Sequence, residues 1–312
     1  MNEYLFERVT PEHYQLLKDL YADAFNIKIS VGDIQKRHNT SELGHPHIGF
    51  IAIQSTTRMP AAYYGVFPVK LIVGSDTILA AQSADTMTHR EHRNKGLFTS
   101  LARLTFDACS RENIELVFGF PNDNSYPGFI SKLNWTRIDN IARYDLKLKI
   151  KTLPLARLFR RAVFLRKLHH SYARFVLRKK IVPAPGSFTN NYPTHYGKVQ
   201  RDEKYIRYKQ SPDKLFVNID NRLIWIKLTD VLWVGDIDNY ESVTVELIRK
   251  IKRIAFKMGY NTITFNFNES LEPPGFLQGF KKHSADTSCI LRINVDDKPE
   301  NILFTGADFD TW

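Results

Sequence analysis

The sequence has few of the features that indicate a secreted or membrane-spanning protein. Its two cysteines, Cys109 and Cys289, lie far apart, so a disulfide framework has no support and a reducing compartment is expected. No stretch approaches the roughly 18 consecutive apolar residues of a membrane-spanning helix. The N-terminal run MNEYLFERVT carries Glu3, Glu7 and Arg8 where a signal peptide needs apolar residues. We therefore expect a cytoplasmic protein.

Motifs for metal, nucleotide and nucleophile sites are also absent. None of the close histidine pairs has a cysteine or carboxylate at zinc-site spacing, so we expect no metal site. The pairs are His45 with His47, His89 with His92, and His169 with His170. The chain contains neither the P-loop pattern G-x-x-x-x-G-K-[ST] nor the nucleophile elbow G-x-S-x-G. These absences disfavour P-loop NTPases and α/β-hydrolases.

Acidic residues are missing from one long segment. The chain of 312 residues has a formal charge of +11, and fourteen Lys or Arg but no Asp or Glu lie between Leu146 and Arg201. The remainder therefore carries −3, which indicates a near-neutral protein with one basic segment rather than a uniformly basic nucleic-acid binder. With 43% hydrophobic residues the chain can bury a core, and its length favours two domains.

The apolar periodicity predicts two similar α/β domains, residues 1–150 and 188–312, joined by a basic amphipathic linker at residues 151–187. In the first, the pattern predicts a helix beginning at Thr10-Pro11 and three strands of an antiparallel meander. A helix, a buried strand, a short helix and a last strand follow, at 96–109, 114–120, 126–133 and 138–149. The second domain repeats the meander, helix, strand, short helix and strand, the last at 288–295.

A strand, a loop and a helix start follow one another at 86–99. The loop supplies Arg93, Lys95 and Gly96 where the first N–H groups of the predicted helix have no partner within it. Such a loop binds phosphate or pyrophosphate through backbone donors, with glycine allowing close approach and the cations adding charge. A basic loop with a glycine near a helix start and no ligand is the alternative.

The run Arg93-Asn94-Lys95-Gly96-Leu97-Phe98 resembles the R-x-x-G-x-G/A signature of the GNAT superfamily of acyltransferases. The strand, short helix and closing Asn134-Trp135 that follow it are similar to the family's order, so the resemblance covers about residues 1 to 150. It implies two GNAT-like domains, each a mostly antiparallel sheet with a central parallel split flanked by helices.

The resemblance also implies that acyl-CoA lies in the split between the fourth and fifth strands. Main-chain groups of the fourth strand would pair with the pantetheine, and the loop and helix start would hold the pyrophosphate. The implied cofactor contacts are Thr86, Met87 and Thr88 for the pantetheine, Arg93, Asn94, Lys95, Gly96, Leu97, Phe98 and Thr99 for the pyrophosphate, and Asn122 and Asn124 after the fifth strand.

The chain departs from the family pattern at three positions. Phe98 replaces a small residue, and Asn134 replaces a glycine, which asparagine tolerates because it enters left-handed turns. The tyrosine that many members use to reprotonate the departing thiolate would fall at Ile130. Tyr126, one helical turn earlier, is our candidate for this general acid, with Ser125 beside it as the alternative; core packing is the structural alternative for Tyr126.

Direct transfer to an amine requires removal of the ammonium proton, because only the free amine attacks. Asp85, near the end of the fourth strand, is the first candidate base, and a hydrogen-bonded strand-end carboxylate is the alternative role. A backbone N–H near Met87 would support the thioester carbonyl. The acidic, aromatic run 306–312 either folds back to line an amine pocket or frays.

The second domain carries acidic residues at 235–241, where the first has its basic loop. Acidic residues repel pyrophosphate, so we expect this half not to bind CoA and to shape the acceptor site. Tandem GNAT proteins with one silent half and Fem-type aminoacyltransferases are similar in outline. The amphipathic segment 153–180 leaves three roles open: packing between the domains, binding an anionic membrane surface at the inner face of the membrane, or binding transfer RNA.

The sequence thus predicts an N-acetyltransferase that uses acetyl-CoA as co-substrate, no metal, and the primary amine of a small molecule such as an amino sugar or a nucleotide-linked or lipid-linked sugar. Two alternatives stay open. One is a non-catalytic acyl-CoA-binding scaffold, motivated by Ile130. The other is an aminoacyltransferase that uses charged transfer RNA, motivated by the basic segment, although nucleic acid is the less expected partner.

Overall fold

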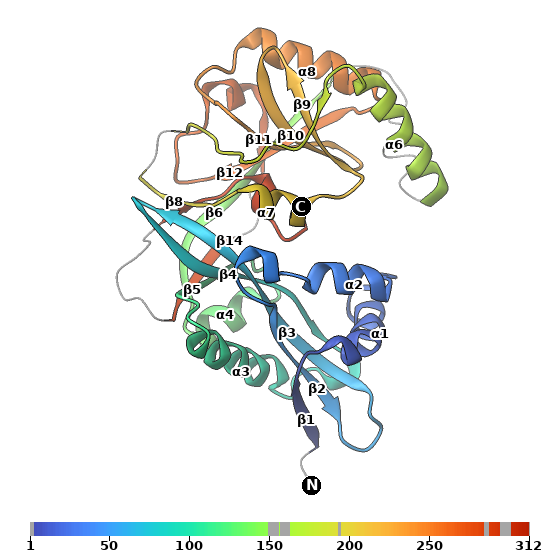
Figure 1. Ribbon diagram of the computed structural model, residues 1–312, viewed down its shortest axis with the longest axis vertical. Coiled ribbons are helices and arrows are strands. Elements are labelled where there is room, and N and C mark those ends of the chain that lie inside the picture. The colour runs from blue at the N-terminus through green and yellow to red at the C-terminus, as the bar shows by residue number, and fades with distance from the viewer. Residues whose placement is uncertain are drawn as a thin grey trace. The chain divides into compact units, whose positions relative to one another are not determined.

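The chain divides into two compact α/β units (Figure 1). The computed structural model describes residues 3–148, 156, 163–192, 195–283, 287–293 and 301–311. Unit 1 comprises Met1–Ile138 and Thr287–Glu300, and unit 2 comprises Asp139–Asp286 and Asn301–Trp312. Each unit contains a mixed sheet with helices, as the sequence predicts.

Unit 1 has strands in the spatial order β1-β2-β3-β4-β5-β14, and within this order β4 and β5 are the one parallel pair that the described residues form. The strands are β1 (Tyr4–Arg8), β2 (Ile48–Gln54), β3 (Pro60–Val73), β4 (Asp76–Thr88), β5 (Leu116–Gly119) and β14 (Thr287–Arg292). The helices are α1 (Tyr14–Phe25), α2 (Val31–His38), α3 (Leu97–Arg111) and α4 (Tyr126–Leu133), with short 3-10 turns η1 (Pro11–His13), η2 (Ser41–Leu43) and η3 (Arg90–His92).

Helices cover both faces of this sheet. Because successive side chains of a strand point to opposite faces, neighbouring residues of β3 contact different helices. Tyr63 packs with Leu17 and Ile34 under α1 and α2. Its neighbour Tyr64 points to the other face and packs with Leu101 of α3. Figure 1 shows these two layers on either side of the sheet.

Unit 2 has the order β7-β9-β10-β11-β12-β6-β13, in which β11 and β12 are parallel, and a separate parallel pair is formed by β8 and β15. The strands are β6 (Thr136–Lys147), β7 (Ile181–Val182), β8 (Gly197–Val199), β9 (Lys214–Ile219), β10 (Arg222–Leu228), β11 (Leu232–Ile237), β12 (Thr262–Asn268), β13 (Lys281–His283) and β15 (Ile302–Leu303). The helices are α6 (Val163–Leu177), α7 (Glu203–Lys209) and α8 (Val245–Lys257), with η4 (Gly275–Gly279) and η5 (Gly306–Asp308). The parallel pair β11 and β12, joined by α8, repeats the arrangement of β4, α3 and β5.

Two strands lie in the opposite unit from the one expected. The strand expected at 288–295 in the second domain is β14, which pairs with β5 of unit 1 from Cys289↔Gly119 to Arg292↔Leu116. The strand expected to close the first domain is β6, which from Asp139 onward belongs to unit 2 and pairs with β12. The domain limits 1–150 and 188–312 therefore differ from those of the structure, because a strand's partner is set by the edge it meets and not by its neighbours in sequence.

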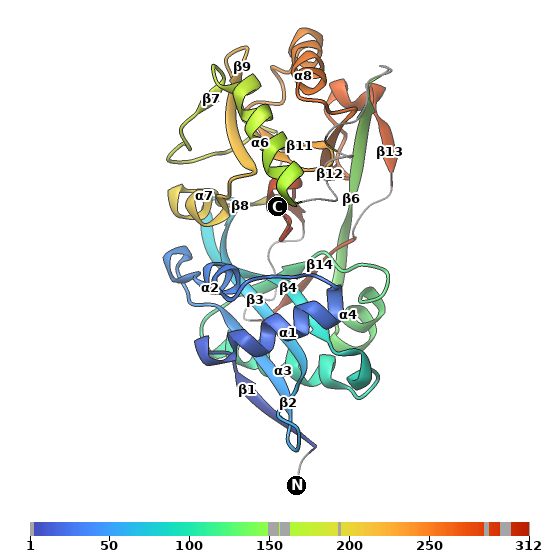
Figure 2. The same cartoon turned by 90° about the vertical axis from the view of Figure 1, so that its right-hand side faces the viewer.

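The expected linker at 151–187 also differs from the structure. Part of it is the helix α6, which packs beside α8 in unit 2 (Figure 2). Residues 149–155 and 157–162 lie outside the described residues.

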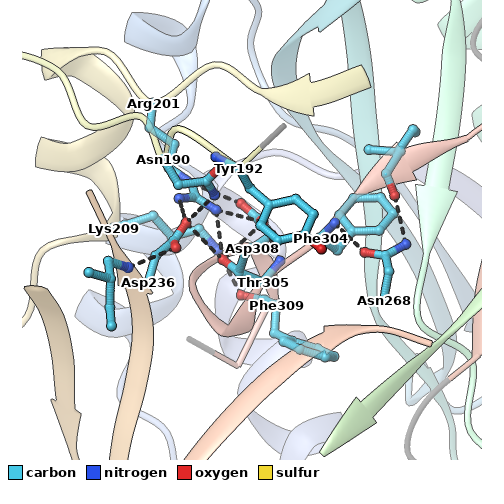
Figure 3. A network of polar contacts seen from close by, with 12 residues as sticks. Asn190, Tyr192, Arg201, Lys209, Asp236, Asn268, Phe304, Thr305, Asp308 and Phe309 are labelled. Atoms are coloured by element: carbon cyan, nitrogen blue, oxygen red, sulfur yellow. Dashed lines mark hydrogen bonds and ion pairs between the residues drawn. The ribbon is translucent and has the colours of Figure 1, made fainter. Parts of the chain in front are cut away.

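A buried ion network fastens the C-terminal segment to unit 2 (Figure 3). The Arg201 guanidinium donates to both carboxylate oxygens of Asp308, at 3.1 and 2.7 Å, and to the Thr305 hydroxyl at 2.8 Å. It also pairs with Asp236, which accepts a further hydrogen bond from Asn190 at 2.8 Å. Burial by itself lowers the pKa of Arg201, but the carboxylates of Asp308 and Asp236 raise that pKa overall, so the guanidinium stays charged.

The same segment is held at two more points. The Asn268 amide accepts from the backbone N–H of Phe304 at 2.7 Å and donates to the carbonyl of Ile302 at 3.0 Å. The Lys209 ammonium donates to the carbonyl of Phe309 at 2.8 Å (Figure 3). Residues 301–311 are thus folded into unit 2. Of the two alternatives for the C-terminal run, the frayed end is therefore wrong for this stretch.

We expect Arg201→Ala to lower the free energy of unfolding by about 3–5 kcal/mol, because it leaves buried carboxylates without their counter-ion. Arg207→Ala is the matched control. Its guanidinium pairs with Glu203 on the surface of α7, and such exposed pairs contribute roughly 0–1 kcal/mol. Urea unfolding of both variants measures the difference, and equal losses would show that the network is not a stabilising element.

Candidate functional site

Strands β4 and β5 part before β4 ends. Their parallel pairing runs from Ala80↔Leu116 to Ser83↔Gly119, where β5 stops. β4 continues to Thr88, which still pairs with Ala62 on the opposite strand β3. Beyond Ser83, the edge of β4 that faced β5 therefore has no strand partner within the described part of the chain. Its backbone N–H and C=O groups are available to an extended ligand.

A bulge lies at the point of divergence. Between the pairs Gly65↔Ala84 and Tyr63↔Met87, β4 has one residue more than β3, and Asp85 takes up the excess with a φ of 57°. The bulge redirects the end of β4, which holds Thr86, Met87 and Thr88. These three residues lie where the resemblance puts the pantetheine, and their contacts with it stay a prediction.

The loop before α3 opens toward free space at its glycine. Gly96 caps the helix with a φ of 75°, and a Cβ at this position would meet no atom within 4 Å. The first helical hydrogen bond runs from the N–H of Ser100 to the carbonyl of Gly96, at 3.1 Å. The N–H groups of Leu97, Phe98 and Thr99 precede it and have no acceptor inside the helix. They form a donor set for an anion at the positive end of the helix dipole.

The two cations of this loop differ. Arg93 is exposed and makes no hydrogen bond or ion pair with any residue that the structure describes. Lys95 instead donates to Glu3 at 2.7 Å and lies over the ring of Tyr4. The hydrogen bond to Glu3 raises the pKa of Lys95, so this ammonium stays charged. Arg93 is therefore the loop's uncommitted cation.

The bulky Phe98 of the signature is matched by a missing side chain on α4. A Cβ at Gly128 would lie 3.0 Å from the Phe98 ring, which is tighter than ordinary packing allows. The Phe98 ring also meets Tyr64 and Phe129, at centroid distances of 5.8 and 5.3 Å. The large residue thus fills the layer behind the loop. Asn134 ends α4 with a φ of 57°, which confirms the left-handed turn.

The segment between β5 and α4 is held by Asn122. Its side-chain oxygen accepts from the N–H groups of Asn124 and Ser125, both at 3.1 Å, and its carbonyl accepts from the Ser125 hydroxyl at 3.3 Å. Tyr126 begins α4 half-buried against the apolar cluster that also contains Ile130. The Tyr126 hydroxyl has no hydrogen bond within the described residues. Its role as general acid stays a prediction.

Asp85 is engaged by an arginine on α2. The Arg37 Nη2 donates to Oδ1 of Asp85 at 2.8 Å, and the Arg37 Nε pairs with Oδ2. The guanidinium also lies over the ring of Phe67, 5.1 Å from its centroid. Accepting a proton on Asp85 therefore requires this two-point contact to loosen. Its role as base stays a prediction.

The sequence did not predict a cluster of two histidines and a tyrosine on the face of the sheet that α1 and α2 cover. The rings of His38 and His47 stack at 3.9 Å, and His47 Nε2 is hydrogen-bonded to the Tyr63 hydroxyl at 2.7 Å. Gly49 and Gly65 pair directly across β2 and β3. A Cβ at Gly49 would lie 2.8 Å from the His47 ring, and one at Gly65 would overlap the Tyr63 hydroxyl. The paired glycines thus make the space that the histidine and tyrosine fill.

Both imidazoles of the cluster are neutral near pH 7. Burial lowers the pKa of His38 to about 4, with Arg37 lowering it further and Asp85 opposing the shift. Burial also lowers the pKa of His47, helped by His38, Arg8 and Arg37. The Nδ1 atom of His38 is buried without a hydrogen-bond partner in the described chain. A neutral imidazole has a lone pair that can accept a proton.

The matching helix start in unit 2 has the opposite character. α8 begins after Thr244, whose hydroxyl accepts from the N–H of Leu247 at 3.1 Å. One backbone donor is therefore already paired with a side chain of the protein. The acidic Asp236 of the preceding segment is buried in the Arg201 network. Among the described residues no group of three or more His, Cys, Asp or Glu could hold a metal, and no helix could cross a membrane.

We expect the His38 cluster to make unit 1 sensitive to acid. An unfolded chain protonates His38 below its ordinary pKa of 6.5, whereas the folded chain keeps it neutral down to about pH 4. The unfolded state therefore binds more protons in this window, and stability falls as the pH decreases, by up to about 3 kcal/mol. Urea unfolding between these pH values should show a flatter profile for His38→Gln than for the native chain. Parallel profiles would contradict the buried, neutral state of His38.

Comparison with known proteins also points to an acetyltransferase domain in unit 1. The family model for the acetyltransferase (GNAT) domain matches residues 6–138. No curated protein matches the chain. A solved structure from Enterococcus faecalis V583, described as a conserved protein of unknown function and probable N-acyltransferase, is 11% identical with a TM-score of 0.60, over 94% of this chain and 73% of that one.

Two further solved structures are similar over nearly their whole length. A putative acetyltransferase from Pyrococcus horikoshii is 12% identical with a TM-score of 0.53, over 97% of this chain and 95% of that one. A GCN5-related N-acetyltransferase from Sphaerobacter thermophilus is 11% identical with a TM-score of 0.53, over 96% and 99%. At this identity the likeness shows the fold, and the match to the acetyltransferase (GNAT) domain lies in residues 6–138, nearly all of the first stretch of unit 1.

Proposed function

We propose that the chain is an acyl-CoA-dependent N-acyltransferase that transfers an acetyl group from acetyl-CoA to the primary amine of a small molecule, such as an amino sugar or a nucleotide-linked or lipid-linked sugar. One observation supports this most directly. The unpaired edge of β4 and the open, Gly96-capped start of α3 lie on consecutive segments of one unit. The first suits an extended amide chain and the second a pyrophosphate, and CoA contains both.

The proposed reaction is direct transfer in a ternary complex. The amine nitrogen attacks the thioester carbon while the backbone N–H near Met87 supports the carbonyl oxygen. The carbon–sulfur bond then breaks, the Tyr126 hydroxyl gives its proton to the departing thiolate, and the proton that the new amide nitrogen loses restores the hydroxyl. Ser125 takes this role if the hydroxyl of Tyr126 does not.

The acceptor ammonium must first lose a proton, and two groups on the α1 and α2 face are candidates. Asp85 is the carboxylate at the bulge, but Arg37 holds both of its oxygens. His47 is neutral, and its partner Tyr63 pairs with Met87 across β3 and β4. We therefore add the His47 and Tyr63 pair as a second candidate base.

The cofactor site can be tested by calorimetric titration of acetyl-CoA into the purified chain. We expect binding by the native chain and none by Gly96→Asp, because an aspartate there places a carboxylate in front of the helix start. Arg93→Ala should weaken binding about tenfold, since it removes one charge-assisted contact. Arg90→Ala is the matched control, because Arg90 contacts Asp23 and should leave the affinity unchanged. Absence of binding by the native chain would overturn the acyl-CoA proposal.

The catalytic groups can be tested by the release of CoA thiol from acetyl-CoA with glucosamine and other primary amines. We expect Tyr126→Phe to lower kcat by about 10²–10⁴ without changing the affinity for acetyl-CoA. Of Asp85→Asn and His47→Gln, the variant with the larger loss of kcat identifies the base.

Two outcomes would favour the alternatives. Binding of acetyl-CoA without turnover of any amine would favour a non-catalytic scaffold. Tight binding of transfer RNA with no CoA requirement would favour a Fem-type aminoacyltransferase.

A further inference from the structure

The helix α6 exposes a row of large apolar side chains. Phe164, Leu168, Tyr172 and Phe175 are 75%, 54%, 46% and 60% exposed. Their spacing of four, four and three residues places them within about 80° of one another around a helix. We call this row the outer face of α6. It holds four of the twelve exposed large hydrophobics in the described chain, on one helix of 15 residues.

The outer face points outward because the opposite side of the helix is fixed to unit 2. Ala173 and Leu177 are buried in the core of that unit. The buried His169 donates its Nε2 proton to the carbonyl of Met258, at 2.8 Å, and its ring packs edge-on against Tyr260. Figure 2 shows α6 at the front of unit 2, facing the viewer. At the edge of the row, the Tyr172 hydroxyl donates to the carbonyl of Lys257 on α8, at 2.9 Å. These contacts hold the helix against rotation, so the row cannot turn inward within this unit.

Positive charge borders the outer face, and negative charge is missing. The exposed cations at 164–179 are Arg166, Lys167, Arg174, Arg178 and Lys179. By helical spacing, Lys167 and Arg178 lie along one border of the apolar row, as does Arg174, whose guanidinium donates to the carbonyl of Pro212 at 3.0 Å. The Arg178 guanidinium lies over the Phe175 ring, 4.2 Å from its centroid. No acidic residue occurs between Leu146 and Asp202, so nothing within this segment neutralises these charges.

We propose that the outer face of α6 lies on an anionic membrane surface, with the apolar row in the outer part of the lipid and the bordering cations at the phosphate headgroups. Large apolar side chains in the middle and Lys or Arg beside them are what an interfacial helix presents to such a surface. The long stems of Lys167 and Arg178 allow their charges to reach the headgroups while Phe175 enters the lipid. At 15 residues the helix is too short to span the bilayer, so it lies along it.

Charge complementarity favours lipid over RNA as the occupant. A phosphate backbone would use the cations, but it offers no hydrocarbon for Phe164 and Leu168 at the centre of the row. An anionic bilayer offers both. This inference does not depend on the acyl-transfer proposal, since it concerns a helix of unit 2 and no residue of the candidate site.

Sedimentation with lipid vesicles tests the proposal. The full chain should pellet with vesicles of phosphatidylglycerol and phosphatidylcholine in equal parts, less with phosphatidylcholine alone, and less again at high salt. The double variant Phe164→Ser with Phe175→Ser should bind at least about tenfold more weakly, because two aromatic rings no longer enter the lipid. Val245→Ser is the matched control: Val245 is 74% exposed on α8, away from the outer face, and its loss should change nothing.

A second double variant tests the contribution of the cations to vesicle binding. Lys167→Gln with Lys179→Gln should reduce the preference for phosphatidylglycerol about tenfold while the weak binding to phosphatidylcholine persists. Thermal unfolding and the acetyl-CoA titration, run on every variant, confirm that each is folded and keep this test separate from that of the cofactor site.

Three results would overturn the proposal. The native chain could fail to pellet with phosphatidylglycerol vesicles at low salt. The serine double variant could pellet as the native chain does. Transfer RNA could be retained where vesicles are not, which would assign the cations of α6 to nucleic acid instead.

Discussion

Backbone hydrogen bonding along β4 is the constraint on which the candidate site depends. One edge of the strand is satisfied by β3 throughout, whereas the other loses its protein partner after Ser83. β5 ends at Gly119, opposite Ser83, where a Cβ would lie 3.4 Å from both Ser83 Cβ and the ring of the buried Trp135. β4 continues beyond this point through the bulge at Asp85.

The same backbone geometry explains why the two units differ in chemistry. Both contain a parallel strand pair joined by a helix. In unit 1 the helix begins at a glycine with open space before it, and in unit 2 it begins at Thr244, which caps it. In unit 2 the segment before the helix also contributes Asp236 to a buried ion network. One copy of the arrangement thus offers backbone donors to a ligand, and the other uses its polar groups to hold the chain together.

Local signals in the sequence predict much of unit 1. The helix start at Gly96 and the left-handed Asn134 each follow from the conformational preference of a few adjacent residues, and the structure has both. The helix expected to begin at Thr10-Pro11 begins there as the 3-10 turn η1, and α1 follows from Tyr14. The cluster of His38, His47 and Tyr63 could not be predicted in this way. Its members come from separate segments, and only the cross-strand register of two glycines brings them together. The partners of β14 and β6 could not be predicted either, because each strand pairs with one that is distant in sequence.

The placement of β14 has a consequence for how the chain is made. The edge of unit 1 next to β5 is completed only by residues 287–292, although the rest of that sheet is encoded before residue 120. During synthesis from the N-terminus, the edge of β5 that pairs with β14 therefore stays uncovered until residues 287–292 have been made. An uncovered strand edge is prone to pairing with other chains. Between the synthesis of β5 and that of β14 the nascent chain is thus open to such pairing, and expression of residues 1–138 alone would leave this edge of β5 without β14.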